Sequence, residues 1–376
     1  MRVFYDSEIF LLQNSGGVSR YFSEIFSNFY SDTSLDIQPS LTFRKSNNLH
    51  LIESHRRLNL KLTPSTFPYP APTSPKRALI TYGPVKFLSS ALASNPYLAP
   101  ARESMFHATY YRPNFLESLG KEFLAITVHD FIPEKLAWNG IKNPHIGKKS
   151  LAKRADLIFC VSKATAEEMQ TFYGDLRADI RIVPHGVSNL GDVNSKTSAS
   201  KVPSVIYVGH RSGYKNFIQL STALRELWRQ GIEVDLITVG PSFSDDEVRE
   251  FIGPENLGFW RHFTKVSDEL LFSLYREASV FCMTSKMEGF GIPILEALSQ
   301  GTGVVLSDIP VAREVAGEAG TYFEIGDVES LKSALVRGIE TARDQEKILE
   351  RIQHASRFTW HRTAQKMAEG YKAFDN

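Results

Sequence analysis

Residues 281–305, FCMTSKMEGFGIPILEALSQGTGVV, have the pattern of a strand, a loop with two glycines, a helix, a glycine stop and a second strand. The apolar run 280–283 has the length of a short strand, and Pro293 stands where a helix begins, because its missing N–H costs nothing there. Gly301 ends the helix, and 304–306 starts the next strand. A helix N-terminus carries free N–H groups and roughly half a positive charge, so this loop can hold a phosphate group.

Two glutamates bracket this loop. Glu288 precedes the helix, near the place where a ligand would extend beyond its phosphates. Glu296 is predicted in the first turn of the helix, where it can face a hydroxyl-rich group such as a ribose. Taken singly, each is more often a surface acid or an acid that favours a helix N-terminus. The surrounding string is more specific than either glutamate alone.

That string, Glu-Gly-Phe-Gly-Ile-Pro followed by Glu-Ala-Leu and by glycine at 301, resembles the signature of retaining glycosyltransferase family 4. The resemblance implies the GT-B fold, an α/β architecture of two Rossmann-like domains facing each other across a cleft. It also implies that Glu288 is catalytic and that the donor is bound by a second set of residues. These are Gly289, Phe290, Gly291, Ile292 and Glu296. The resemblance covers nearly the whole chain and is weakest between about 31 and 100.

Length and composition agree with two ordinary globular domains. The 376 residues exceed what one core usually organises, and the hydrophobic fraction of 42% and charged fraction of 23% are average. The net charge of +1 gives no indication of nucleic-acid binding, and none is predicted. Cys160 and Cys282 lie in apolar runs, which predicts buried, reduced thiols. With no signal peptide and no apolar run near the ~18 residues of a membrane span, a cytoplasmic location is predicted.

Composition and resemblance together predict the domain boundaries. An acceptor-side Rossmann-like domain is expected over 1–188 and the nucleotide-sugar donor domain over 200–357. The intervening residues 189–199 are rich in Ser, Gly, Asn and Lys without periodicity, which indicates a linker. In this family a helix such as the one predicted over 358–376 packs back onto the first domain.

The first strand, 1–5, is followed by a turn with Gly16 and Gly17 and by an amphipathic helix. The pattern is not the GxGxxG dinucleotide fingerprint, so a Rossmann dehydrogenase is disfavoured. A Gly-Gly pair alone is more often a plain turn. The resemblance implies a loop that faces the donor pyrophosphate and the acceptor.

Two histidines follow apolar strands in the first domain. The predicted strand 123–128 runs directly into His129, and ligands of open α/β sheets bind at that end of a strand. The resemblance implies a catalytic histidine at the reacting sugar, and a buried structural histidine is the alternative. His185 stands where the family usually has Asn, and we interpret it as a hinge variation.

Arg211 and Lys215 follow the first strand of the second domain and would share a helix face if the turn is helical there. Singly, each is more often a solvated surface charge. The resemblance implies that both are catalytic and grip the donor diphosphate, Arg as a planar fork and Lys as a point charge. The sequence has no DxD motif, the metal-binding signature of GT-A enzymes. No metal or other cofactor is therefore predicted, and the nucleotide-sugar is a substrate.

The predicted function is retaining, metal-independent sugar transfer from a nucleotide-sugar to a glycan or polyprenyl-diphosphate-linked acceptor. The short form Arg-Ser-Gly-Tyr-Lys-Asn-Phe resembles the subgroup that builds bacterial O-antigen and related surface polysaccharides, often with mannosyl donors. A GDP-mannose-like donor is therefore favoured, with UDP- and dTDP-sugars as rivals. A sugar-nucleotide epimerase of GT-B shape and a non-catalytic nucleotide-sugar-binding protein remain alternatives.

Residues 44–86 differ in character from the rest of the chain. They hold eight Lys and Arg residues against one acid, with prolines that exclude a regular helix or central strand in the middle of the segment. A solvated loop is one interpretation. The other is a basic surface that meets an anionic membrane and would hold the protein peripherally on the inner face of that membrane.

Overall fold

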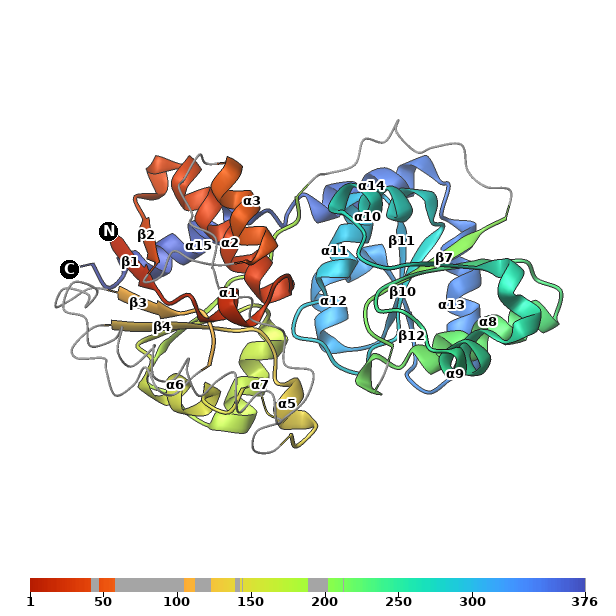
Figure 1. Cartoon of the computed structure of the whole chain (residues 1–376), viewed down its shortest axis with the longest axis horizontal. Helices are drawn as coiled ribbons and strands as arrows, with labels where there is room; N and C mark the ends of the chain where they lie inside the picture. The colour runs from red at the N-terminus through yellow and green to blue at the C-terminus, as the bar shows by residue number, and fades with distance from the viewer. Residues whose placement is uncertain are drawn as a thin grey trace. The chain divides into compact units, whose positions relative to one another are not determined.

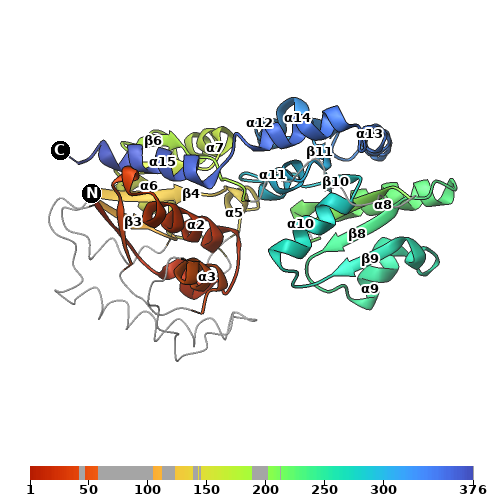
Figure 2. The ribbon, with the colours of Figure 1, turned by 90° about the horizontal axis from the view of Figure 1, so that it is seen from above.

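The computed structural model describes residues 1–41, 47–57, 105–111, 123–138, 143, 145–188, 202–211 and 213–375. The chain divides into two compact units, Met1–His185 with Trp360–Asn376, and Gly186–Thr359. Each unit is built on a parallel β-sheet with helices on both faces (Figures 1 and 2). The predicted α/β class with two Rossmann-like units is confirmed.

The first unit has a sheet whose described strands run in the order β2-β1-β3-β4-β5-β6, all parallel. The strands are β1 Arg2–Tyr5, β2 Gln38–Leu41, β3 Met105–Ala108, β4 Phe123–Val128, β5 Leu157–Cys160 and β6 Asp179–Ile182. The helices are α1 Glu8–Leu12, α2 Gly17–Ser31, α3 Leu49–Arg57, α5 Ile132–Lys135, α6 Lys148–Arg154, α7 Lys163–Tyr173 and α15 Trp360–Lys372.

Helices α2, α3 and α15 cover one face of this sheet, and α6 and α7 cover the other (Figure 1). A chain of buried hydrogen bonds fastens α15. The Tyr371 hydroxyl lies 2.9 Å from the Tyr5 hydroxyl and 2.5 Å from Nδ1 of His107, whose Nε2 lies 3.0 Å from Thr127 Oγ1. Since buried polar groups need partners, these hydrogen bonds favour one placement of α15 on the sheet.

The second unit has the strand order β12-β11-β10-β7-β8-β9, again all parallel. The strands are β7 Ser204–Val208, β8 Asp235–Val239, β9 Trp260–Phe263, β10 Val280–Met283, β11 Gly303–Ser307 and β12 Gly320–Phe323. The helices are α8 Phe217–Arg229, α9 Asp245–Glu247, α10 Asp268–Glu277, α11 Ile292–Ser299, α12 Pro310–Ala316, α13 Val328–Glu340 and α14 Gln345–Ala355.

Helices α8 and α13 pack together on one face of the second sheet, and α10, α11, α12 and α14 lie on the other (Figure 1). The strand, glycine loop, helix and strand predicted from residues 281–305 are confirmed as β10, α11 and β11. The left-handed φ of 74° at Gly301, which follows α11, explains the glycine there. Cys160 and Cys282 are buried free thiols, as predicted.

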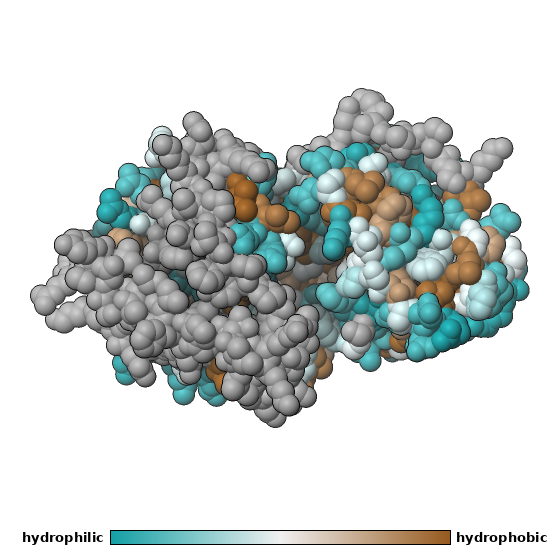
Figure 3. Space-filling view, viewed as in Figure 1, coloured by the Kyte–Doolittle hydropathy of each residue, from teal (hydrophilic) through white to brown (hydrophobic). Residues whose placement is uncertain are grey.

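The surface of the second unit visible in Figure 3 mixes hydrophilic residues with small apolar areas, which is ordinary for a globular protein. Within the described residues, no helix is long and apolar enough to span a bilayer. The linker predicted over 189–199 lies outside the described residues. Of the basic segment 44–86 the structure describes residues 47–57, which include α3, and the rest lies outside the described residues. The prediction of a membrane-facing surface there stays a prediction.

Candidate active site

The second sheet has a topological switch point between β7 and β10. From β7 the chain adds β8 and β9 on one side, and it then returns to add β10, β11 and β12 on the other. Ligands of open α/β sheets bind outside the carboxyl ends of the strands at such a point. Lys215 follows β7 and Glu288 follows β10, so both lie at this place in the fold.

The structure joins these two predicted residues in an ion pair. Lys215 Nζ donates to Glu288 Oε1 at 2.6 Å, with the two side chains 23% and 13% exposed. The turns that carry them are also tied together. Lys286 N donates to Tyr214 O at 2.8 Å, and Thr284 Oγ1 donates to Lys215 O at 2.8 Å. A half-buried ammonium group is thus held at the switch point by groups that are far apart in the sequence.

Helix α11 begins beside this pair. Gly291 is its N-cap residue with a left-handed φ of 92°, and Pro293 is its second residue. This positive φ favours glycine, and a Cβ atom at Gly291 would also approach Ile294 Cδ1 to 2.8 Å, so that the isoleucine side chain would have to shift. The first amides of the helix add positive potential a few residues after Glu288, the carboxylate that Lys215 contacts.

Glu296 lies one residue further into α11 than predicted, because the helix starts at Ile292, and it therefore falls just beyond the first turn. Its side chain is 4% exposed and accepts a hydrogen bond from the Tyr275 hydroxyl at 3.3 Å. Tyr275 belongs to α10, and nothing in the sequence indicated this contact. The ring of Phe290, predicted among the donor-binding residues, is buried and lies 6.3 Å from that of Phe358. Phe290 is therefore a packing residue that offers a ligand only its backbone.

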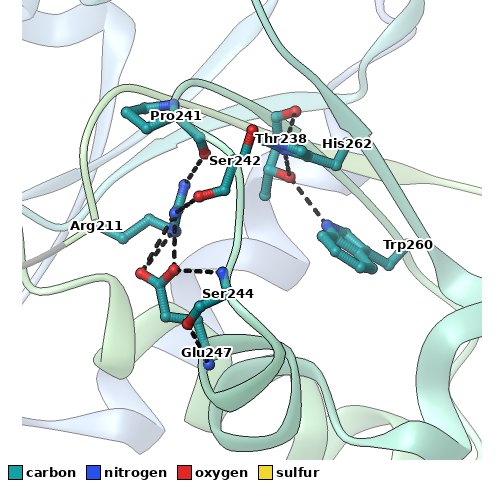
Figure 4. A network of polar contacts seen from close by, with 8 residues as sticks. All are labelled: Arg211, Thr238, Pro241, Ser242, Ser244, Glu247, Trp260 and His262. Carbon is teal, nitrogen blue, oxygen red and sulfur yellow. Dashed lines mark hydrogen bonds and ion pairs between the residues drawn. The ribbon is translucent and has the colours of Figure 1, made fainter.

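Arg211 does not share the partners of Lys215. Its Nη1 donates to Pro241 O at 2.6 Å and its Nη2 to Ser242 O at 2.9 Å (Figure 4). Its Nε and Nη2 donate to the carboxylate of Glu247, with Nη2 3.1 Å from Oε2. The guanidinium carbon also lies 3.7 Å from the centre of the Phe243 ring.

This arrangement corrects the expectation of a shared helix face. Only Gly213–Lys215 is helical in the described part of the turn, as a single 3-10 turn, and Arg211 lies before it. The two cations are paired with different carboxylates. The hydrogen bond from the Ser244 backbone N–H, and then that from Arg211, hold the pKa of Glu247 below its usual range.

His129 stands at the end of β4 in the first unit, as predicted. Its ring is 9% exposed and packs edge-on against Tyr21 at 5.2 Å, and its backbone N–H donates to the Tyr111 hydroxyl at 3.1 Å. Burial, and next the neighbouring His185, place the pKa of His129 well below its ordinary value. No group in the described part of the chain hydrogen-bonds to its Nε2. The imidazole is therefore neutral and retains one nitrogen for a further contact.

His185, interpreted from the sequence as a hinge variation, packs among aromatic rings in the structure, and its role as a hinge stays an interpretation. It is buried, stacks on His129 at 5.7 Å and lies 5.8 Å from the ring of Trp360. No sequence pattern indicated this contact, because the two histidines are 56 positions apart.

A buried lysine lies beneath the turn that carries His129. Lys148 Nζ donates to Asp130 O at 2.5 Å and to Glu134 Oε2 at 2.9 Å, and it lies 3.1 Å from Nδ1 of His145. Sequence reasoning missed this cluster, since a lysine among charged helical residues is usually a solvated charge. A carboxylate and a backbone carbonyl compensate the burial of the ammonium group and fix the turn.

Gly16 and Gly17 lie at the start of α2. Gly16 is the N-cap residue with an extended backbone, and a Cβ atom there would approach Gln13 Oε1 to 2.5 Å. That same oxygen accepts a hydrogen bond from Ser19 N at 3.2 Å. The glycine thus leaves room for a side chain that caps the helix.

Two family models match adjacent parts of the chain. The model of glycosyltransferase family 4 matches residues 51–189, and that of glycosyl transferases group 1 matches residues 192–357. The chain belongs to glycosyltransferase family 4. Its second matched region contains the whole Lys215, Glu288 and α11 arrangement.

Curated relatives include two mannosyltransferases of Escherichia coli. The serotype-specific mannosyltransferase WbdA is 29% identical over 228 residues, which are 54% of this chain and 28% of that protein. O-antigen chain mannosyltransferase B is 27% identical over 282 residues, 70% of this chain and 74% of that protein. The match thus spans little more than a quarter of the WbdA length.

Solved structures share the fold over nearly the full length. Sucrose-phosphate synthase from Thermosynechococcus elongatus aligns with a TM-score of 0.73 at 17% identity, covering 99% of this chain and 98% of that one. Anabaena Alr3699/HepE, solved in complex with UDP and glucose, aligns with a TM-score of 0.69 at 17% identity, covering 98% of both chains. At such identity these structures establish the GT-B architecture alone.

Proposed function

We propose that this chain transfers a sugar from a nucleotide-sugar donor to a glycan or polyprenyl-diphosphate-linked acceptor, with retention and without a metal ion or other cofactor. The observation that carries the proposal is the ion pair of Lys215 and Glu288 beside the N-terminus of α11, at the switch point of the second sheet. Family membership indicates which chemistry this arrangement serves.

Cleaving the bond between sugar and phosphate leaves negative charge on the diphosphate and positive charge on the anomeric carbon. Lys215 and the first amides of α11 are the groups that would stabilise the leaving diphosphate. One positioned donor of this kind is typically worth about 3–4 kcal/mol of transition-state stabilisation. The Lys215 side chain is 23% exposed, and the neighbouring protein groups that restrain it lower the cost of holding it in place.

Glu288 would act at the sugar. Its carboxylate can accept hydrogen bonds from sugar hydroxyls or steady the positive anomeric carbon. His129 of the first unit would serve as a neutral hydrogen-bond partner for the sugar or its phosphate, because its pKa is held low by burial. Glu296, oriented by Tyr275, would accept hydrogen bonds from the ribose.

The donor we propose is a GDP-mannose-like sugar. The support is that both curated relatives described above are mannosyltransferases, one named as serotype-specific and the other for the O-antigen chain. We accordingly propose a role in bacterial surface polysaccharide synthesis. We also propose that the protein acts in the cytoplasm, at an anionic membrane surface where a polyprenyl-linked acceptor would be available.

The test combines nucleotide binding with transfer. Thermal shifts with GDP, UDP, dTDP and ADP identify the nucleotide, and incubation with the matching sugar donor, with and without a mannan-type acceptor, measures transfer. We expect stabilisation by GDP, an α-linked product from an α-linked donor, and full activity in EDTA. Stabilisation by UDP alone would remove the mannose donor. Activity lost in EDTA and restored by magnesium would overturn the metal-independent mechanism, and donor turnover without acceptor would favour an epimerase.

A further inference from the structure

Residues 240–247, which we call the β8 loop, follow β8 and include the short helix α9. One side chain from the end of another strand organises them. All three guanidinium nitrogens of Arg211 donate into this loop, to two backbone carbonyls and to Glu247 (Figure 4). The Arg211 side chain is 5% exposed and that of Glu247 32% exposed. Arg211 thus lies inside the loop that it contacts.

The loop is also internally fixed on either side of this contact. Ser244 and Glu247 form a capping box, with Glu247 N donating to Ser244 Oγ at 3.2 Å and Ser244 N donating to Glu247 Oε2 at 2.9 Å. One carboxylate therefore serves both the helix cap and the guanidinium. Replacing Arg211 would deprive the loop of its donors at Pro241 and Ser242 as well as of its countercharge.

The position of the β8 loop indicates which part of a donor it would meet. At its start, a Cβ atom at Gly240 would lie 2.4 Å from Gly209 O, so the backbones that follow β8 and β7 touch. In doubly wound sheets the turn after the first strand holds phosphates, and the end of the neighbouring strand holds the ribose. In this unit those strands are β7 and β8.

Two roles for Arg211 can be separated on these contacts. A residue that binds the leaving group must offer its N–H groups to the diphosphate. A residue that only tethers a loop donates the same N–H groups to other parts of the protein. The guanidinium is stacked on Phe243 at 3.7 Å and bonded on its edges to the loop, so the contacts are those of a tether.

We propose that Arg211 is a positioning residue which, together with Glu247, fastens the β8 loop as the nucleoside-binding wall of the donor site. The proposal rests on the function proposed above. It assigns leaving-group stabilisation to Lys215 and α11, and nucleotide affinity to the pair of Arg211 and Glu247.

The test uses Arg211→Lys, Glu247→Gln and the double variant of the full chain. Lysine keeps the charge but cannot reproduce the planar fork, and glutamine removes the charge while still allowing a capping box. Arg249→Gln is the matched control, because Arg249 lies in the same region and pairs with Asp246 at the surface, where the side chains are 64% and 89% exposed. Three quantities are measured: hydrogen exchange of amides 240–248 without ligand, the Kd for GDP and UDP, and kcat and KM for the donor.

We expect each single variant to speed amide exchange in the loop and to raise nucleotide Kd and donor KM about tenfold, while kcat at saturating donor stays within about threefold of wild type. The double variant should resemble the single ones, because both changes remove one interaction. The Arg249→Gln control should match wild type.

A fall in kcat of a hundredfold in Arg211→Lys, with wild-type behaviour of Glu247→Gln, would make Arg211 a leaving-group ligand and overturn the proposal. Unchanged amide exchange in both variants would refute the proposal that Arg211 and Glu247 fasten the loop, regardless of which nucleotide the wild type binds. Wild-type protein that binds neither nucleotide would instead overturn the proposed donor class, and this result is independent of the exchange measurement.

Discussion

His185 offers a test of how burial governs the acid stability of the first unit. Its ring lies 4.9 Å from Tyr21, 5.7 Å from His129 and 5.8 Å from Trp360. Burial lowers the pKa of His185 to about 3, and it does the same for His107 and His145. The folded unit therefore requires neutral imidazoles, whereas histidines of the unfolded chain have a pKa near 6.5.

Because the folded pKa values lie below the unfolded ones, the stability due to these neutral rings is fully present above about pH 6.5 and is lost as the pH falls toward 3. Below about pH 6.5 each such histidine lowers the free energy of unfolding by roughly 1.4 kcal/mol per pH unit, which amounts to about 2 kcal/mol at pH 5. Three of them amount to about 6 kcal/mol, which is comparable with the whole stability of an ordinary domain.

The perturbation is His185→Asn, which removes one titrating ring and puts the residue most usual in the family at that position. At pH 7 we expect the variant to be less stable by roughly 1–3 kcal/mol, because the ring contacts are lost. Between pH 7 and pH 5 it should lose about 2 kcal/mol less than wild type, because one proton fewer is taken up on unfolding.

The assay is urea unfolding at pH 7, 6 and 5, followed by tryptophan fluorescence. Trp138 and Trp360 report on the first unit, and Trp228 and Trp260 on the second. His361→Asn, which removes a histidine that is 52% exposed in the same unit, is the control. If wild type and His185→Asn lost equal stability between pH 7 and pH 5, the folded protein would protonate His185 freely and the reasoning would be refuted.

Two further predictions address the site and the returning helix. Lys215→Ala should lower kcat by roughly tenfold to a thousandfold in the transfer assay, since one leaving-group donor is lost, and an unchanged kcat would remove Lys215 from the mechanism. Tyr371→Phe should lower the free energy of unfolding by roughly 2–4 kcal/mol, because the Tyr5 hydroxyl and His107 Nδ1 lose their shared buried partner. Unchanged urea unfolding of that variant would show that the hydrogen-bond chain does not fasten α15.

The local structure of the second unit could be predicted from the sequence, because each pattern that indicates a strand, a helix or a helix end there spans only a few residues. Alternation of apolar runs with Gly and Pro predicts β10, α11 and β11, and the Ser267 side chain caps α10 through Leu270 N as its position suggests. The start of α11 was misplaced by one residue, because a glycine with positive φ serves as the N-cap and no Ser or Asp marks the boundary.

Contacts between distant strand ends could not be predicted in the same way. Lys215 and Glu288 are 73 positions apart, and their pairing depends on β7 and β10 lying side by side at the switch point. Arg211 and Glu247 are 36 positions apart and meet only because β7 pairs with β8. The resemblance identified three of these four residues by motif, but Glu247 belongs to no motif and was missed.

The pairing of Lys215 with Glu288 links donor binding to the placement of the carboxylate. Lys215 Nζ lies 2.6 Å from Glu288 Oε1, so a diphosphate that binds Lys215 would have to compete with that carboxylate for the ammonium group. With the proposed donor, each contact from Lys215 to a phosphate would weaken its hold on Glu288, whose side chain could then turn to the sugar of that donor. On this reasoning Glu288→Gln removes a competitor for Lys215 and a sugar contact together. It should therefore lower kcat severely while nucleoside diphosphate binds at least as tightly as to wild type, and calorimetric titration with GDP would measure that difference directly. Weaker GDP binding by the variant would mean that the carboxylate holds Lys215 in position for the phosphate and does not compete for it.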